Sequence, residues 1–242
     1  MTPPARIVVA GGTGALGGAL VELLIAQGDR VAVPFRSPEP FARLRARLPA
    51  SDTLWGAHAD IATISGARAF ADAAATALGG MDGVAVVSGA YTGSGLLAES
   101  PADEWGSMMQ ANLETAHSVC RAAIPHLTAR GGSVVTVASR LIDNGGAGAA
   151  AYVVAKAGVS ALTSVLALEY RGRVRFNCVA PGTIDTPDNR AAMPSADRSS
   201  WTSPQSIARV IAFLLSPASA PVTGACIPVD GANPDRPGSG WP

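Results

Sequence analysis

The sequence RIVVAGGTGALGG, residues 6–18, runs from an apolar segment into a glycine-rich turn and then into an Ala/Leu-rich segment. The first five residues are typical of a buried strand, and a helical pattern begins at Ala15. Glycines let the backbone turn sharply and approach a pyrophosphate, whose charge the amino end of the following helix favours. No Gly-Lys-Ser/Thr follows, which disfavours a nucleoside-triphosphate site. We therefore predict a dinucleotide site at Gly11, Thr13, Gly14, Leu16 and Gly17.

The same order of strand and helix continues along the chain. Almost wholly apolar runs predict buried parallel strands at 6–10, 30–35, 53–57, 83–87, 132–138, 173–179 and 226–229. Helical patterns lie between them at 15–27, 41–48, 63–78, 102–130, 149–170 and 204–215. Because strands that alternate with long helices form right-handed βαβ units, we predict an α/β fold. It is a single Rossmann-type, doubly wound parallel sheet of about seven strands with helices on both faces.

The 242 residues contain no linker that would divide the chain. We predict a single nucleotide-binding domain over residues 1–232 and a Pro/Gly-rich tail over residues 233–242. The stretch 183–203 is polar and shows no clear element, and loops of this length in compact domains commonly bind ligands. We therefore predict a substrate lid there.

Charge and composition exclude several classes of protein. Lys plus Arg and Asp plus Glu both number 18, so there is no net charge, and no basic stripe predicts a nucleic-acid partner or an anionic membrane. The apolar stretches are interrupted by Gly, Ser or Lys and predict no membrane span. The three cysteines match no metal or disulfide spacing, which favours buried thiols in a reducing compartment. With no targeting pattern in the first residues, we expect a cytoplasmic protein without a metal site.

The end of the second predicted strand bears on the choice of dinucleotide. An NAD site usually places an acid here for the ribose 2′-hydroxyl, whereas arginine accommodates a 2′-phosphate. Arg36 and Ser37 stand at this position, and no acid does. The sequence therefore favours NADP(H) over NAD(H). Pro34 lies within the predicted strand and predicts an early end to it, because proline removes a ladder donor.

The only lysine of the chain, Lys156, follows Tyr152 by four residues. On a helix these two side chains share a face, with Cβ atoms roughly 5–6 Å apart. An ammonium group beside a phenol lowers the pKa of the phenol and makes it an acid/base near working pH. Ser139 ends the fifth predicted strand, where α/β folds bind ligands, and its hydroxyl suits a developing alkoxide. The three residues predict proton transfer to or from a substrate oxygen.

These motifs, in this order and spacing, resemble the classical short-chain dehydrogenase/reductase family over about residues 5 to 231. The resemblance rests on the glycine turn, Asp60-Ile61, Asn112 in Ala-Asn-Leu, Ser139, Tyr152-Val-Val-Ala-Lys156 and Pro181-Gly-Thr-Ile-Asp-Thr-Pro187. Thr223-Gly224 and Val229-Asp230-Gly231 fit the closing strand of the family. The resemblance implies a nicotinamide cofactor and a homo-oligomer, a tetramer or a dimer, with helices near 102–130 and 149–170 at one interface.

The resemblance also implies a role for individual residues. Tyr152 would donate the proton in reduction, Lys156 would lower its pKa and hold the nicotinamide ribose, and Ser139 would orient the carbonyl. Asn112 would anchor a water in a proton relay that includes Lys156. The remaining cofactor contacts would come from Asp60 and Ile61 at the adenine, from Gly89, and from Pro181, Gly182, Ile184 and Thr186 at the nicotinamide.

The sequence departs from the family pattern at three places. Ala10 replaces the threonine before the first glycine, and Ala15 replaces the middle glycine unless Gly11, Gly14 and Gly17 keep a GxxGxxG spacing. The family sequence Asn-Asn-Ala-Gly after the fourth strand is Val-Val-Ser-Gly here, at residues 86–89. None of these changes falls on the four predicted catalytic residues.

The sequence as a whole predicts an enzyme that reversibly reduces a ketone or related carbonyl to an alcohol with NADP(H). One alternative is a non-catalytic dinucleotide-sensing or interaction protein with the same fold. A second is an NAD-linked alcohol dehydrogenase, epimerase or dehydratase. The predicted partner is a small carbonyl or alcohol substrate, and no motif identifies which one.

Overall fold

The computed structural model describes residues 3–50 and 52–230 and contains one seven-stranded parallel sheet. The order of the strands is β3-β2-β1-β4-β5-β6-β7, so the chain reverses its direction of travel between β1 and β4. The strands are β1 (Arg6–Ala10), β2 (Arg30–Phe35), β3 (Leu54–His58), β4 (Gly83–Val86), β5 (Ser133–Val137), β6 (Arg175–Pro181) and β7 (Cys226–Val229). The predicted fold class is confirmed, and the predicted tail at 233–242 lies outside the described residues.

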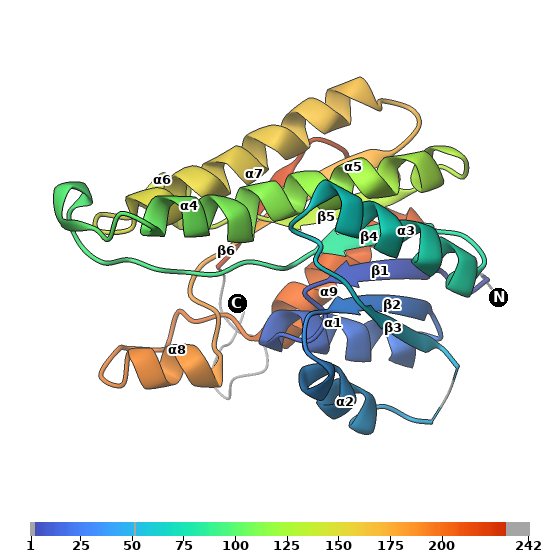
Figure 1. The fold of residues 1–242 in the computed structure, drawn as a ribbon, viewed down its shortest axis with the longest axis horizontal. Helices are drawn as coiled ribbons and strands as arrows, with labels where there is room; N and C mark the ends of the chain where they lie inside the picture. The colour runs from blue at the N-terminus through green and yellow to red at the C-terminus, as the bar shows by residue number, and fades with distance from the viewer. Residues whose placement is uncertain (1–2, 51, 231–242) are drawn as a thin grey trace, which may run out of the picture.

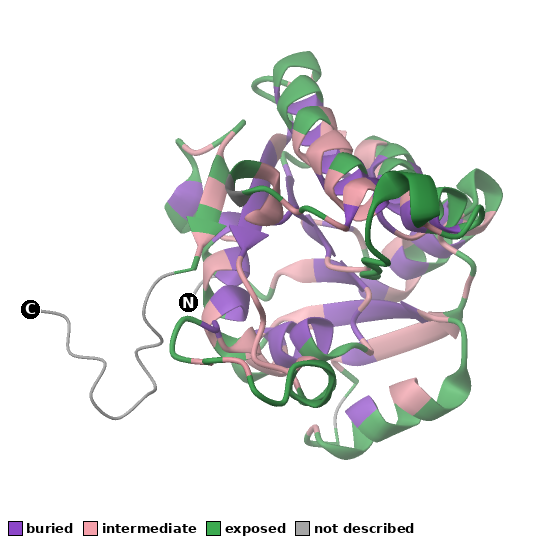
Figure 2. Ribbon diagram, turned by 90° about the vertical axis from the view of Figure 1, so that its left-hand side faces the viewer, coloured by how far each residue is buried: buried purple, intermediate pink, exposed green. Residues whose placement is uncertain are grey.

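The helices cover both faces of the sheet (Figure 1). They are α1 (Ala15–Ala26), α2 (Pro38–Ala46), α3 (Ile64–Leu78), α4 (Glu104–Met108), α5 (Thr115–Thr128), α6 (Leu141–Asn144), α7 (Ala150–Glu169), α8 (Pro187–Ala192) and α9 (Pro204–Leu215). Short 3₁₀ turns occupy Leu97–Glu99 and Pro217–Ser219. Figure 2 shows buried strands between helices whose outer surfaces are exposed.

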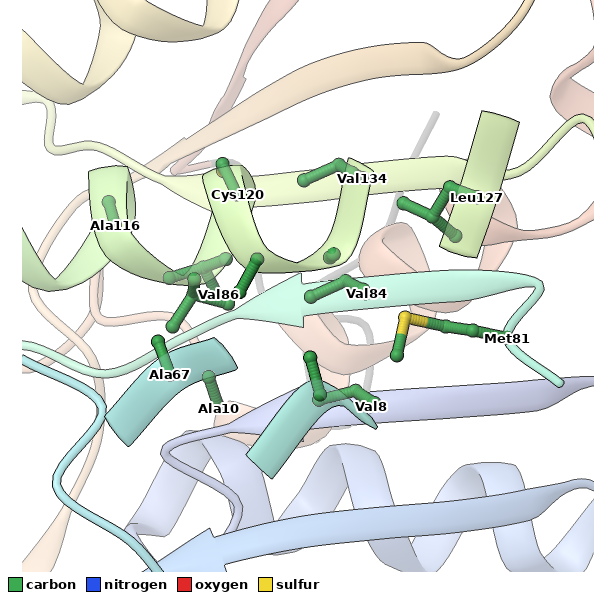
Figure 3. Packing of buried hydrophobic residues seen from close by; sticks show 14 of the residues in the cluster. Val8, Ala10, Ala67, Met81, Val84, Val86, Ala116, Cys120, Leu127 and Val134 are labelled. Atoms are coloured by element: carbon green, nitrogen blue, oxygen red, sulfur yellow. The ribbon is translucent and has the colours of Figure 1, made fainter. Parts of the chain in front are cut away.

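Each face of the sheet carries its own apolar core. On one face α3, α5 and α7 pack against β1, β4 and β5; on the other, α1, α2 and α9 pack against β1, β2 and β5. Figure 3 shows the first of these cores, where Cys120 and Leu127 of α5 lie over Val84, Val86 and Val134 of the strands. Burial of both faces explains why the strands are continuously apolar rather than alternating.

Besides shifts of a few residues at the ends of several elements, two predicted segments contain a local irregularity that the sequence did not show. The helix predicted over 102–130 consists of α4, a π-helical segment at Met109–Glu114, and α5. The predicted lid, 183–203, contains α8, which begins after its N-cap Thr186 with Pro187 at the first helical position. A six-residue helix is too short to show a periodic apolar pattern.

Pro34 does not end β2 early, contrary to the sequence expectation, since the strand continues to Phe35. Val31 donates to Thr53 O and Phe35 O accepts from Ala59, so odd-numbered residues of β2 bond to β3. The backbone nitrogen of Pro34 therefore faces β1, and the pairing of β2 with β1 ends at Ala32 and Val8, before Pro34 is reached. The missing amide of proline removes no ladder bond there.

Helix α7 is long and apolar enough to span a membrane by length and composition, with a mean hydropathy of 1.6, contrary to the expectation that no segment reaches that limit. It packs on the sheet through Val159, Leu166 and Ala167, and it holds the buried Lys156. Its apolar character is therefore that of a helix packed against a sheet core.

Candidate active site

The predicted site residues follow the carboxyl ends of six strands, and in a parallel sheet these ends meet at one edge. The order of the strands reverses between β1 and β4, which is where α/β folds bind their ligands. The residues follow β1 (Gly11, Thr13, Gly14, Leu16, Gly17), β2 (Arg36, Ser37), β3 (Asp60, Ile61), β4 (Gly89), β5 (Ser139) and β6 (Pro181, Gly182, Ile184, Thr186).

The turn after β1 is closed by two glycines that leave no room for a side chain. Gly11 has φ +91°, and a Cβ atom on it would lie 2.6 Å from the amide nitrogen of Ser88. A Cβ atom on Gly17 would lie 2.0 Å from the carbonyl oxygen of Gly11. These glycines are therefore required by the packing of the protein itself.

Gly14 differs, because a Cβ atom there would approach only the Gly11 oxygen, at 3.5 Å. Gly14 is the N-cap of α1 and provides no side-chain cap, so the first turn presents backbone amides at the positive end of the helix. Thr13 is half-buried in the turn, whereas the side chain of Leu16 points into the core. At Leu16 only the backbone is available to a ligand.

Arg36 and Ser37 lie at the exposed end of β2, as the sequence predicts. Ser37 is the N-cap of α2 but its side chain makes no capping bond, and Pro38 follows at the first helical turn. A guanidinium, a hydroxyl and a helix amino end thus lie next to each other in the chain. All three are groups that bind phosphate.

Asp60 and Ile61 form the turn after β3. The Asp60 carboxylate accepts a hydrogen bond from the backbone amide of Ala62 at 3.2 Å, and its carbonyl accepts one from the Thr63 hydroxyl at 3.0 Å. Ile61 is half-buried and packs on the core beneath α3 and α5. The turn therefore has a fixed shape, with Asp60 exposed at the edge of the sheet.

Tyr152 in α7 and Ser139 after β5 come together through a hydrogen bond between their side chains. Burial raises the pKa of Tyr152, the bond with Ser139 lowers it, and the nearby Tyr91 raises it again, so that the net pKa lies above the ordinary value. The sequence led us to expect a pKa lowered by Lys156. In this structure desolvation of the phenol is instead the larger effect.

Lys156 is buried, and its Nζ donates to the carbonyl oxygen of Val137, the last residue of β5, at 2.9 Å. The Nζ lies 5.8 Å from the centre of the Tyr152 ring. Burial lowers the pKa of Lys156 to about 8, with a small opposing effect of Cys178. The ammonium therefore lies beside the phenol and is oriented by the strand.

Asn112 approaches Lys156 from the other side, at Gly89. A Cβ atom on Gly89 would lie 2.6 Å from Asn112 Oδ1 and 3.1 Å from Lys156 Nζ, so these two polar atoms flank the same point. Asn112 Nδ2 donates to the carbonyls of Ala90 and Met108, both at 3.0 Å. Its Oδ1 is buried and has no hydrogen-bond partner among the described residues.

The π-helical segment Met109–Glu114 explains how Asn112 reaches this position. A π-helical turn contains one residue more than an α-helical turn and often marks a functional site. The side chain of Asn112 is buried at the sheet side of the helix, where its amide bridges to the loop after β4. Neither the composition nor the spacing of 102–130 shows this irregularity.

The segment after β6 is held at both ends. The carbonyl of Pro181 accepts from the amide of Arg140, and Thr186 caps α8 by accepting from the Asn189 amide at 3.2 Å. Ile184 forms an isolated β-bridge with Thr202, which ties the two ends of the predicted lid together. Gly182 lies between Pro181 and Ile184, and a Cβ atom on Gly182 would lie 3.4 Å from Asp230 Cβ.

Two further residues lie next to the predicted site residues without being among the predicted catalytic or cofactor-binding residues. The ring of Tyr91 packs edge-on against Tyr152, with ring centres 4.9 Å apart. Arg140 follows Ser139 and forms ion pairs with Asp143 at 2.5 Å and Asp230 at 2.6 Å, which connect the ends of β5 and β7. The position of Arg140 beside Ser139 was the available signal for Arg140, and for Tyr91 it was the position of an aromatic residue in the loop after β4.

These features fit a bound dinucleotide. The glycine turn leaves open space at Gly14, the amino end of α1 has no side-chain cap, and Asn112 Oδ1 is a buried acceptor without a partner. Residues 11–17 would hold the pyrophosphate, Arg36 and Ser37 the adenosine ribose, and the Tyr152–Lys156 pair the nicotinamide ribose.

Comparisons with known proteins agree with this architecture. Residues 11–232 match the family model described as enoyl-(acyl carrier protein) reductase. A 3-oxoacyl-(acyl-carrier-protein) reductase of Chlamydia pneumoniae is 35% identical over 159 residues, which cover 61% of this chain and 64%, less than two thirds, of that relative. The 3beta-hydroxysteroid dehydrogenase 1 of Eggerthella lenta is 32% identical over 96% of this chain and 94% of its own.

Among solved structures, a short-chain type dehydrogenase/reductase from Mycobacterium ulcerans superposes with a TM-score of 0.89 at 27% identity. The superposition covers 96% of this chain and 90% of that structure. The family match, the identity to full-length relatives and the strand order lead to one assignment. The chain belongs to the short-chain dehydrogenase/reductase family of oxidoreductases.

Proposed function

We propose that this protein is an NADP(H)-dependent oxidoreductase that interconverts a ketone or related carbonyl and the corresponding alcohol. The observation that carries the proposal is the grouping of four side chains at the carboxyl ends of β4 and β5: the Ser139–Tyr152 pair, and Lys156 with Asn112 around Gly89. The nicotinamide, when bound, supplies or accepts the hydride, and the chain supplies orientation and proton transfer.

Each of the four side chains has a distinct role in this proposal. The Tyr152 hydroxyl donates its proton to the carbonyl oxygen, and the Ser139 hydroxyl donates a hydrogen bond to the same atom. Because burial raises the pKa of Tyr152, the phenol carries its proton at neutral pH, which suits the direction of reduction. Lys156, with a pKa of about 8, returns a proton to Tyr152, and the Asn112 carbonyl accepts a hydrogen bond from a water in this relay.

A test of the catalytic assignment compares the wild type with Tyr152→Phe on a panel of ketones in the presence of NADPH. The panel includes 3-ketosteroids and 3-oxoacyl thioesters, since relatives carry names for these substrates. Loss of the proton donor is expected to lower kcat by about 10²–10⁴-fold, the usual contribution of general acid catalysis, with NADPH affinity retained. Unchanged turnover in Tyr152→Phe would overturn the assignment. NADPH binding without turnover of any carbonyl would favour a dinucleotide-sensing protein.

The cofactor preference rests on Arg36 and Ser37, which are exposed at the end of β2, where an NAD site usually has an acid and this chain has none. Calorimetric titration with NADPH and NADH is expected to show tighter binding of NADPH. Arg36→Ala should weaken the binding of NADPH by about 10–100-fold, which is the contribution of a hydrogen bond to a charged group. It should leave the affinity for NADH unchanged. Arg43→Ala, an exposed arginine of α2 beyond the strand end, is the matched control. Preference of the wild type for NADH would overturn the assignment to NADP(H).

We also propose that the enzyme is a homo-oligomer that associates through the outer surface of α7. Val154, Val165 and Leu168 on this helix are 45%, 50% and 64% exposed, and their spacing places them on one side of the helix. Exposed apolar residues grouped in this way are typical of protein interfaces. Sedimentation equilibrium of the wild type and of Val165→Asp tests the proposal, and a monomeric wild type would contradict it.

A further inference from the structure

Two of the three cysteines, 48 positions apart in sequence, are paired in the last two strands of the sheet. Cys178 in β6 and Cys226 in β7 are register partners, and both are free thiols. Parallel neighbouring strands lie about 4.7–4.9 Å apart, within the range of about 4.4–6.8 Å between the Cα atoms of a disulfide. Register partners also point to the same face of the sheet. The backbone therefore holds the two thiols where a bond between them can form.

The two thiols differ in their access to solvent. Cys178 is 1% exposed and packs with Ala138 and Ala180, with Ile142 of α6 over them. Cys226 is exposed, because β7 is the edge strand of the sheet and alternates exposed and half-buried residues. One thiol can thus meet a solute directly, whereas its partner is shielded from solvent.

The surroundings favour the thiolate on the exposed member. The Cys178 thiol has two acceptors, the carbonyl oxygen of Val179 at 3.6 Å and the Cys226 sulfur, and the bond to Cys226 has the largest effect on the pKa of Cys226. Burial and Asp143 raise the pKa of Cys226, whereas Ser160 of α7 and Arg140 lower it, and the net value is about 6. The same bond and burial raise the pKa of Cys178, so the inner thiol keeps its proton. A low-pKa, accessible thiol next to a second thiol is the arrangement found in redox-sensitive cysteine pairs.

We propose that Cys178 and Cys226 form a redox-active dithiol, which a hydroperoxide such as hydrogen peroxide converts to a disulfide between β6 and β7. The Cys226 sulfur attacks one peroxide oxygen; an S–O bond forms, the O–O bond breaks, and the leaving hydroxide takes a proton to become water. Cys178 then attacks the Cys226 sulfenic acid; the S–S bond forms, the S–O bond breaks, and the Cys178 proton leaves with the hydroxide as a second water. Two thiols lose two electrons and one peroxide gains them. A low-molecular-weight dithiol reverses the reaction by exchange.

The pair lies outside the group of residues to which we assign proton transfer, but it is connected to the same region. Cys178 is three residues before Pro181, where β6 passes into the segment that we assign to the nicotinamide. The register of β6 with β7 consists of four pairs, from Cys178–Cys226 to Pro181–Val229. A disulfide at the first pair would fasten the edge strand to this segment. The proposal does not depend on which substrate the enzyme uses.

Peptide mapping without reduction tests the disulfide directly. The full-length protein is treated with hydrogen peroxide, quenched, digested and analysed by mass spectrometry, in the wild type and in Cys120→Ala, Cys178→Ala and Cys226→Ser. We expect one Cys178–Cys226 cross-link within a chain in the wild type and in Cys120→Ala, because Cys120 is buried in α5 against the sheet. Cys178→Ala should instead leave a sulfenic acid at Cys226 that dimedone traps. Three remaining thiols, or a cross-link between two chains or to Cys120, would overturn the proposal.

The pH dependence of alkylation tests the role of Cys178 as donor. With iodoacetamide, the alkylation rate of Cys226 in the wild type should have its midpoint below that of an ordinary thiol, because the hydrogen bond from Cys178 lowers the pKa of Cys226. In Cys178→Ala the donor is lost, and the midpoint should move upward toward about 8.5, the value of an ordinary thiol. A midpoint near 8.5 in the wild type, or one that Cys178→Ala leaves unchanged, would contradict the dithiol. Dithiothreitol should restore both thiols of the oxidised wild type.

Discussion

At the scale of single residues, burial is the main influence on the proposed proton-transfer group. Lys156 is 5% exposed and has one hydrogen bond, to Val137 O. Removing an ammonium from water favours its neutral form, which accounts for a pKa lowered to about 8. The same effect with opposite sign raises the pKa of the half-buried Tyr152. The two pKa values therefore move apart, so that the phenol holds its proton more tightly than the ammonium does and can take one back from it.

The buried ammonium predicts a specific pH dependence of stability. Between about pH 8 and 10.5 the native chain binds fewer protons at Lys156 than the unfolded chain, so the free energy of unfolding rises with pH in this window. Relative to Lys156→Met, the wild type should gain up to about 3 kcal/mol across it. Urea unfolding of both proteins without cofactor at pH 7 to 10.5 measures the gain. Arg43→Met is the exposed control, and a difference between wild type and Lys156→Met that is independent of pH would contradict the burial argument.

At the scale of elements, the turn between β1 and α1 divides its glycines into two kinds. Gly11 and Gly17 face other parts of the protein, and a side chain on either would collide with backbone. Gly14 faces open space at the amino end of α1. A sequence motif does not distinguish these cases, but their consequences for folding and binding differ.

This division predicts different outcomes for two substitutions of the same type. Gly17→Ala should lower the thermal midpoint strongly, since its Cβ atom would lie 2.0 Å from the Gly11 oxygen. Gly14→Ala should keep the thermal midpoint of the wild type, because its Cβ atom would make only an ordinary van der Waals contact. It should weaken the binding of NADPH, because the new methyl group would stand where the pyrophosphate approaches the turn. Differential scanning calorimetry and NADPH titration separate the two. Wild-type affinity in Gly14→Ala would argue against a pyrophosphate at this turn.

At the scale of the whole molecule, the two edges of the sheet are used differently. Arginines at the amino ends of strands hydrogen-bond to carbonyls of neighbouring segments: Arg6 to Gly79, Arg30 to Leu78, and Arg175 to Ser216 and Ser219. The carboxyl edge carries the predicted site residues instead. The molecule thus places arginine contacts at one edge and the open turns of the site at the other.

The ion pair at the amino edge predicts an acid-dependent stability. Burial raises the pKa of Asp82, but the hydrogen bonds from the side chain and backbone of Arg6 lower it by more, so the net pKa lies below 3.8. The resulting stabilisation is present above pH 3.8 and is lost as the pH falls toward the native pKa. Asp82→Asn should lose about 2 kcal/mol at pH 6, typical of hydrogen bonds to a charged group, and less at pH 3. Asp72→Asn, in an exposed ion pair, is the control, and equal losses at pH 6 and pH 3 would contradict the ionic origin.

Much of the fold follows from local sequence, and the strands illustrate why. Strands β1, β2 and β7 occupy the residues that the apolar runs predict, and the other strands differ by one or two residues at an end. The irregular elements were not predicted: the π-helical turn around Asn112 is accompanied by a hydrogen bond to the distant Ala90, and the helix α8 is too short to show a periodic pattern. Local pattern records composition and periodicity, but no long-range contact.

The sequence by itself determined the order of strands and helices, the glycine turn and the identity of the candidate site residues, because apolar runs, glycines and short spacings are local properties of the chain. Only the tertiary structure decided which way the pKa of Tyr152 moves, that Lys156 is held by Val137, and that Asn112 and Lys156 meet at Gly89. It also decided that Cys226 is exposed and opposite Cys178, although the sequence favoured buried, separate thiols. Burial and distance between residues far apart in the chain set these properties, and both arise only when the strands assemble.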